Sequence, residues 1–140
     1  MKNKIIYALL ITLIFSLTLI SCAKEESTPS LWDSATYTES VTLGEGAKTI
    51  KVEVKAEEKS VVFTINTDAQ YLGEALTEHS LVSGDNTEFG LYIKSVNGMK
   101  AEYETDGYYW SLEKGGEYLM TGVDTTEIAD GEEYALIRTK

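Results

Sequence analysis

Residues 50 to 65 of this 140-residue chain, IKVEVKAEEKSVVFTI, contain its clearest strand pattern. From Ile50 to Val54 apolar residues alternate with charged ones, and this period of two is typical of a strand with one buried face. The apolar run from Val61 to Ile65 predicts a second strand. Because the charged turn around Glu57 to Lys59 separates the two runs, the stretch predicts a β-hairpin.

The segment after the hairpin predicts one short helix. Thr67 or Asp68 can cap its first turn, with Gln70 three residues after Thr67. Apolar residues then recur at helical spacing, with the only histidine in phase: Leu72, Ala75, Leu76 and His79. The helix should end before Gly84, and the polar segment from Ser83 to Thr87 predicts a loop.

The remaining sequence predicts several strands joined by tight turns. Alternation from Leu91 to Val96 favours a third strand, and Asn97-Gly98 favours a hairpin because a type I′ turn needs positive φ at both central residues. More strands are expected at 99–103, 108–113, 117–120 and 132–138, with glycine turns at 106–107, 115–116 and 130–131. The predicted fold class is α+β: a small, mostly antiparallel β domain with one α-helix, either as two packed sheets or as a β-grasp-like arrangement.

Residues 1–21 predict a lipoprotein signal peptide. A short basic start precedes an apolar run from Ile5 to Ile20, which is shorter than the roughly 20 residues of a membrane-spanning helix. The run ends at Leu19-Ile20-Ser21-Cys22, which is similar to a lipobox, and lipidation would fall on Cys22. The alternative is an ordinary signal peptide, or an uncleaved anchor, with an incidental cysteine. Since Cys22 is the only cysteine, we expect an extracytoplasmic protein anchored by lipid to the cell membrane, at the cell surface or the periplasmic face.

Composition divides the expected mature chain into a flexible tether at 22–47 and one domain at 48–140. The tether segment is mostly Ser, Thr, Glu, Gly and Lys, which is too polar to repay the entropy of ordering. Trp32 and Tyr37 are exceptions, and they either dock on the domain or remain loose. The remainder is large enough for one small domain and too small for two.

The acidity of the chain excludes one class of partner. Its net charge is −11, and removal of the signal peptide leaves 10 basic against 23 acidic residues, a net charge of −13. Such a surface repels nucleic-acid phosphates and anionic lipid headgroups. We therefore expect no nucleic-acid partner, and membrane contact only through the lipid on Cys22.

An ordered series of short motifs between Gly90 and Gly131 carries a family resemblance. The series comprises GLYIKSVNGM, YYWSL, a Gly-Gly hairpin, YLMTGVD and DGE. It resembles the C-terminal domain of the cobalamin carriers transcobalamin and intrinsic factor, and a bacterial family of transcobalamin-like C-terminal domains often carried by surface lipoproteins. The resemblance covers roughly 48–140. It implies binding of cobalamin or a related corrinoid, for capture and uptake, rather than catalysis.

The resemblance implies a set of eight ligand-binding residues. They are Tyr92, Tyr109, Trp110, Tyr118, Met120, Thr121, Gly122 and Val123. In the carriers this domain closes over one face of the corrin while a larger helical domain holds the other. This chain has no such helical domain, so its site would be shallower or would be completed by a partner, such as a membrane transporter component.

Individual members of this set have competing explanations. Strand alternation places Tyr109 and Trp110 on opposite faces, so both cannot face the ligand, and Trp110 either contacts it or fills the core. Gly122 either lets the backbone approach a ligand or marks a β-bulge or turn. Asp124 departs from the small residue of the carrier loop.

The sequence predicts neither catalysis nor a metal site. It lacks an available nucleophilic cysteine, a Ser-His-acid signature and a ligand cluster for zinc. His79 fits a helix boundary better than a cobalt ligand, and the 85–88 segment lacks the alternating oxygen ligands of a calcium loop. We expect a non-enzymatic binding domain with no covalently bound cofactor.

The alternative function is a protein or polymer interaction module of the adhesion type, because a small β domain with exposed tyrosines and an open sheet edge can bind extended partners. The nine tyrosines of the chain serve either function. A corrinoid-binding domain should present a concave aromatic and apolar patch around Trp110 and Gly122. An adhesion module should present a flat, polar, tyrosine-rich face.

Overall fold

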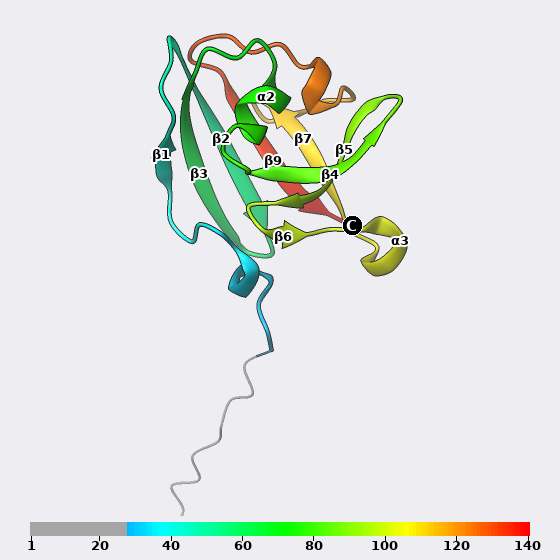
Figure 1. The fold of residues 1–140 in the computed structure, drawn as a ribbon. Coiled ribbons are helices and arrows are strands. Elements are labelled where there is room, and N and C mark those ends of the chain that lie inside the picture. The colour runs from blue at the N-terminus through cyan, green and yellow to red at the C-terminus, as the bar shows by residue number, and fades with distance from the viewer. Residues whose placement is uncertain (1–27) are drawn as a thin grey trace, which may run out of the picture.

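Two β-sheets and a few short helices form the fold in a computed structural model that describes residues 28–140 (Figure 1). The six-stranded sheet contains, in spatial order, β1 (Val41–Leu43), β3 (Lys59–Thr67), β2 (Lys48–Ala56), β9 (Glu133–Thr139), β7 (Tyr109–Lys114) and β8 (Glu117–Tyr118). The three-stranded sheet contains β4 (Val82–Thr87), β5 (Gly90–Val96) and β6 (Met99–Lys100). The helical elements are η1 (Leu31–Ser34), α2 (Leu72–Thr77), α3 (Tyr103–Asp106) and η2 (Val123–Thr125). The predicted fold class is confirmed.

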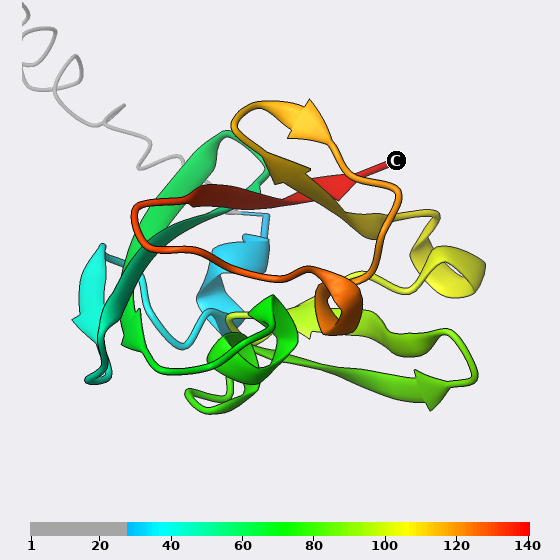
Figure 2. The ribbon, with the colours of Figure 1, turned by 90° about the horizontal axis from the view of Figure 1, so that it is seen from above.

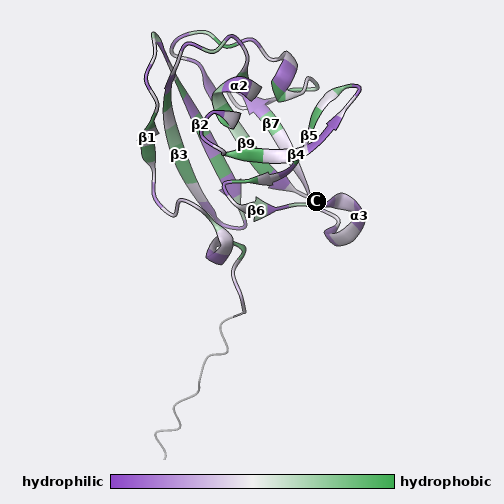
Figure 3. Ribbon diagram, in the orientation of Figure 1, coloured by the Kyte–Doolittle hydropathy of each residue, from purple (hydrophilic) through white to green (hydrophobic). Residues whose placement is uncertain are grey.

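The hairpin predicted at 50–65 is the centre of the larger sheet. β2 and β3 pair antiparallel along their whole length, from Lys48 opposite Thr67 to Ala56 opposite Lys59. Bands of hydrophobic and hydrophilic residues alternate along both strands (Figure 3). β9 lies beside β2 in the parallel direction and beside β7 in the antiparallel direction. Most strand pairs are antiparallel, as expected, but this central parallel pair was not foreseen.

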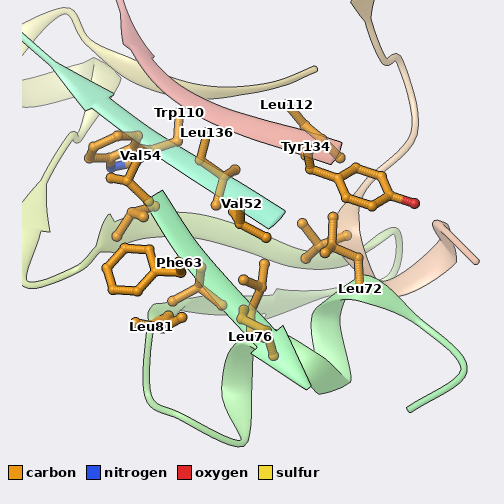
Figure 4. Close-up of a cluster of buried hydrophobic side chains, with 14 of the residues drawn as sticks. Val52, Val54, Phe63, Leu72, Leu76, Leu81, Trp110, Leu112, Tyr134 and Leu136 are labelled. Atoms are coloured by element: carbon orange, nitrogen blue, oxygen red, sulfur yellow. The ribbon is translucent and has the colours of Figure 1, made fainter. Parts of the chain in front are cut away.

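The core lies between the two sheets, with α2 covering one end. Seen from above, the three-stranded sheet and α2 face the six-stranded sheet as a second layer (Figure 2). Phe63 and Leu136 from the larger sheet meet Leu76 of α2 in the cluster shown in Figure 4, and all three side chains are fully buried. Burial of such side chains supplies roughly 1.5–3 kcal/mol each, which is the main stabilising term of a domain this size.

The structure corrects the expected tether at 22–47. Residues 28–47 are part of the described domain, and we call residues 30–43 the N-terminal strap. Trp32 is buried, and its Nε1–H donates to the carbonyl of Ala56 at 2.9 Å. Tyr37 packs edge-on against Phe63, and β1 pairs with β3 in parallel. Two aromatic side chains dock a segment whose average composition is polar. The signal peptide and Cys22 lie outside the described residues.

Two further predictions were wrong in detail. Thr67 does not cap the helix but is the buried last residue of β3. The helix begins at Leu72, where the Glu74 carboxylate accepts the backbone N–H groups of Gln70 and Tyr71 at 3.1 and 3.2 Å. The predicted loop at 83–87 is strand β4, which forms backbone bonds to β5 although its side chains beyond Val82 are exposed.

The turns between strands follow the sequence more closely. The Asn97-Gly98 turn joins β5 to β6, with φ of +51° and +81° as a type I′ turn requires. Gly115-Gly116 joins β7 to β8 in the predicted hairpin. The strand expected at 99–103 ends at Lys100, and the unexpected helix α3 follows it. No helix within residues 28–140 is long and apolar enough to cross a membrane.

Candidate ligand-binding groove

A cavity of about 210 Å³ lies between the two sheets, where β5 faces β7 and the segment from Tyr118 to Val123. All eight residues that the resemblance assigns to the ligand contribute to its wall: Tyr92, Tyr109, Trp110, Tyr118, Met120, Thr121, Gly122 and Val123. They come from three separate stretches of the chain. The fold therefore brings the predicted set together in one place.

A second hollow, of about 720 Å³, continues this cavity toward the tip of the β4–β5 hairpin. The two share Leu91, Tyr92 and Gly122, so we treat them together as the groove. Phe89 lines the outer part and was not predicted. A large apolar residue in the turn between Glu88 and Gly90 was the available signal, but an isolated turn residue has no periodicity to mark it.

The rim of the groove exposes large apolar side chains to water. Met120 is 93% exposed and Phe89 is 84% exposed, followed by Tyr118 at 58% and Tyr92 at 45%. Exposed apolar residues are ordinary when scattered, but a contiguous group beside a concavity marks a binding surface. The fold gains nothing from exposing these four side chains.

Trp110 belongs both to the core and to the wall of the groove. Its side chain is 8% exposed and packs in the hydrophobic cluster, and it also lines the inner cavity. Its buried Nε1–H has no hydrogen-bond partner among residues 28–140. Tyr109 contributes to the same wall although the two side chains leave β7 on opposite faces. That only one side chain of this pair faces a ligand stays a prediction.

Hydroxyl groups hold the loop around Gly122. The Thr126 and Thr125 hydroxyls donate to the carbonyl of Gly122 at 2.8 and 3.2 Å, and the Thr121 hydroxyl lies 3.2 Å from that of Thr126. Gly122 has an ordinary φ of −76°, and a Cβ added there would meet nothing within 4 Å. Gly122 therefore leaves the groove open without being required by the backbone.

Asp124 connects this loop to both α2 and β5. Its Oδ2 accepts the backbone N–H of Leu91 at 2.8 Å. Its side chain also lies against Gly73 so closely that a Cβ at Gly73 would collide with Oδ1. Asp124, which differs from the small residue of the carrier loop, thus has a structural role in this chain.

Glu132 stabilises the segment that follows η2 and leads into β9. Burial alone would raise the pKa of Glu132, but Lys114 at 2.6 Å, the Tyr134 hydroxyl and the N–H of Ala129 at 3.0 Å outweigh it. Together they lower this pKa from 4.5 to about 2. Burial and the neighbouring carboxylate of Glu132 raise the pKa of Tyr134, so its hydroxyl remains a donor.

Comparison with known proteins supplies the family. A family model described as "Domain of unknown function (DUF4430)" matches residues 70–134. A solved "putative metal binding protein" from Ruminococcus gnavus is 36% identical, with a TM-score of 0.64, and the match covers 67% of this chain and 98% of that protein. The chain belongs to the DUF4430 family. The DUF4430 match includes the whole rim of the groove, and the comparison with curated proteins found no match.

A second solved structure resembles the DUF4430 domain in fold. Haptocorrin, solved in complex with Cbi, matches 66% of this chain with a TM-score of 0.51 and 21% identity. The match covers 25% of haptocorrin, so this chain corresponds to one quarter of that protein. At this identity the likeness concerns the fold alone.

The name of the Ruminococcus gnavus protein directs attention to metal ligands. Within residues 28–140, no group of three or more His, Cys, Asp or Glu side chains is placed to hold a metal ion. His79 lies after α2, where its Nε2 is close to Gly44, and it does not line the groove. Asp85 lies on β4 and forms an ion pair with Lys94 at 2.6 Å.

Proposed function

We propose that this DUF4430 protein is a non-enzymatic lipoprotein that binds cobalamin or a related corrinoid in the groove, for capture and uptake. One observation carries the proposal: eight residues chosen from a family resemblance line a single concave surface that contains both Trp110 and Gly122. Its concavity and its aromatic side chains support a corrinoid-binding domain, and polar groups share the surface. The fold likeness to haptocorrin in its Cbi complex is a second, independent support.

The shape of the groove suits one edge of a flat macrocycle. The inner cavity of about 210 Å³ accepts an edge, and the outer hollow of about 720 Å³ leaves room for the adjoining face. Tyr92, Tyr118 and Met120 offer flat or adaptable apolar contacts to ring methyl groups.

The open side of the groove could be covered by a partner protein. The exposed rim would leave the far face of a bound macrocycle in water, and this chain corresponds to only a quarter of haptocorrin. A membrane transporter component is the partner we propose for uptake. Apolar rim residues left in water are suited to such a contact.

The proposed location follows from the lipid on Cys22. The described chain enters the domain at η1, at the opposite end from the β4–β5 tip and η2 (Figure 1). A lipid-anchored protein with this arrangement would present its groove away from the membrane surface. The groove would then be accessible to ligands at the cell surface or in the periplasm.

The test is a calorimetric and absorbance titration of the purified protein with cobinamide and with cobalamin. We expect saturable binding that Tyr118→Ala weakens about tenfold, since one aromatic contact contributes roughly 1 kcal/mol or more. Tyr103→Ala is the matched control, because Tyr103 is 61% exposed on α3 and does not line the groove. Absence of binding by either corrinoid at high protein concentration, or equal weakening by both variants, contradicts the proposal.

The interaction module remains a second candidate because of the outer face of the six-stranded sheet. That face has an open, shallow hollow of about 850 Å³ whose lining includes Lys51, Glu53, Thr64 and Glu113. Charged side chains line it, as an adhesion surface requires, but apolar atoms make up slightly more of its surface than polar ones, and the tyrosine in its lining, Tyr134, is buried. If the protein binds no corrinoid but Thr64→Arg abolishes binding to a polysaccharide or peptide array, this candidate replaces the first.

A further inference from the structure

The two walls of the groove are attached to the domain in different ways. The wall formed by the loop after β8 is bonded to the start of α2 through the backbone. The N–H of Leu72 donates to the carbonyl of Thr126 at 2.9 Å, and the N–H of Ile128 donates to the carbonyl of Gln70 at 3.0 Å. This wall is therefore fixed by bonds that no side-chain substitution removes.

The other wall is the β4–β5 hairpin, and it has a single polar attachment to this loop. In the part of the chain that the structure describes, only the N–H of Leu91 and Oδ2 of Asp124, at 2.8 Å, join the hairpin to the loop by a hydrogen bond. The polar side-chain contacts nearer the tip stay within the hairpin, such as Lys94 with Asp85 at 2.6 Å. Because the side chains of β4 beyond Val82 are exposed, few apolar contacts restrain that tip.

The fit around Asp124 is tight on both sides. A Cβ at Gly73 would collide with Oδ1, and a Cβ at Gly90 would lie 3.1 Å from Oδ2. Gly90 also has a φ of +101°, which other residues rarely adopt. The carboxylate therefore occupies a slot between two glycines on different elements, where a larger neighbour would displace it.

The Asp124–Leu91 hydrogen bond joins the two walls beside the residues that the inner cavity and the outer hollow share. Leu91 lines both the inner cavity and the outer hollow, and Gly122, two residues before Asp124, lines both as well. Separation of Leu91 from Asp124 would widen the junction between the two parts. This bond is thus placed to control passage between the outer hollow and the inner cavity.

We propose that Asp124 is a positioning residue that holds the β4–β5 hairpin against the η2 loop and sets the aperture of the groove. Opening of the Asp124–Leu91 hydrogen bond lets a ligand edge enter or leave, so the bond determines the ligand dissociation rate. The statement about the ligand rests on the proposed corrinoid function, whereas the positioning of the hairpin does not.

The first test measures hydrogen exchange of the Leu91 amide by NMR in the purified protein without ligand. Hydrogen bonds to charged groups are strong enough that Asp124→Ala should accelerate this exchange about tenfold. Asp124→Asn keeps an acceptor oxygen and should show a smaller increase. Asp85→Asn is the matched control, because it removes a carboxylate of the same hairpin that does not contact the loop, and it should leave Leu91 unchanged.

A second variant guards against a general loss of folding. Gly73→Ala keeps the aspartate at position 124 but forces its carboxylate out of the slot. We expect it to accelerate hydrogen exchange of the Leu91 amide as much as Asp124→Ala does. The exchange rates of the β2 amides serve as the reference in every variant, since local opening of the hairpin should not change these rates. Unchanged exchange at Leu91 in folded Asp124→Ala protein overturns the proposal, as does an equal acceleration at Leu91 and in β2.

The ligand part is tested by stopped-flow dissociation of cobinamide. We expect Asp124→Ala to increase the dissociation rate about tenfold while Asp85→Asn does not. If Leu91 exchange accelerates and the dissociation rate is unchanged, the role in ligand release is overturned. If the unsubstituted protein does not bind cobinamide, the corrinoid function fails, and the exchange result still decides whether Asp124 positions the hairpin.

Discussion

The N-terminal strap and the β4–β5 hairpin both lie against the rest of the domain, but they do so in opposite ways. The strap buries Trp32 and is bonded to two distant turns, since Ser30 donates to Glu57 at 3.1 Å and Asn97 is bonded to Tyr37. The hairpin leaves Phe89 84% exposed and has one hydrogen bond to the opposite loop. Aromatic residues in the strap stabilise the fold, whereas those on the rim of the groove are exposed to water.

The largest effect is expected when Trp32, the buried aromatic residue of the strap, is removed. We expect Trp32→Ala to lower the free energy of unfolding by about 3–5 kcal/mol, because it leaves a large cavity and removes the hydrogen bond to the Ala56 carbonyl. Urea unfolding followed by circular dichroism measures the loss. Thr38→Ala, an exposed strap residue, should change it by less than about 0.5 kcal/mol. A small effect of Trp32→Ala would mean that the strap is dispensable.

A smaller effect is expected at the turn that receives the strap. Asn97 is fully buried, its Oδ1 accepts the N–H of Tyr37 at 2.9 Å, and its Nδ2 donates to the Tyr37 carbonyl at 2.8 Å. Asn97→Gly keeps the positive φ but removes both bonds, so we expect a loss of about 2 kcal/mol in urea unfolding. Asn86→Ala, at an exposed position of β4, is the control. Equal stability of the two variants would show that the strap needs no side-chain bond at this turn.

The stability of the protein at acid pH tests the contribution of Glu132, which lies just before β9. The pKa of Glu132 is lowered to about 2 in the folded protein from 4.5, so its stabilisation is fully present above pH 4.5 and is lost as the pH falls toward 2. Between pH 6 and pH 2.5 the free energy of unfolding of the unsubstituted protein should fall by roughly 2 kcal/mol more than that of Glu132→Gln. Urea titrations at several pH values measure this difference.

Glu133→Gln supplies the control for the acid prediction. The side chain of Glu133 is 67% exposed, and within residues 28–140 its one ion pair is with Lys51 at 3.8 Å. Exposed pairs of this kind contribute little, so Glu133→Gln should follow the unsubstituted protein at every pH. A pH profile for Glu132→Gln that also coincides with that of the unsubstituted protein would exclude Glu132 as the titrating group.

The contrast between these regions also explains what the sequence could predict. The β2–β3 hairpin and the Asn97-Gly98 turn depend on neighbouring residues, and local patterns located both. The strap depends on single aromatic residues that dock on a distant surface, and average composition concealed them. β4 was not predicted, because an edge strand is held by backbone hydrogen bonds and needs no pattern of apolar side chains.

The candidate site divides in the same way. The motif series located eight wall residues because they follow one another closely along the chain in a familiar order. Phe89 was missed because a turn residue has no period, and the role of Asp124 was missed because its contacts join residues more than 30 positions apart. Long-range contacts of single polar residues leave no signal in one sequence.

The smallest expected effect on stability sharpens the comparison most directly. Phe89→Ser removes an aromatic side chain that is already in water, so the free energy of unfolding should change by less than about 0.5 kcal/mol, in contrast to Trp32→Ala. Under the proposed function the same substitution should weaken cobinamide binding several-fold, because Phe89 lines the outer part of the groove. Parallel urea unfolding and titration of one protein sample measure both quantities. A stability loss above about 1 kcal/mol would place Phe89 with the strap aromatics, as part of the fold rather than of a binding surface.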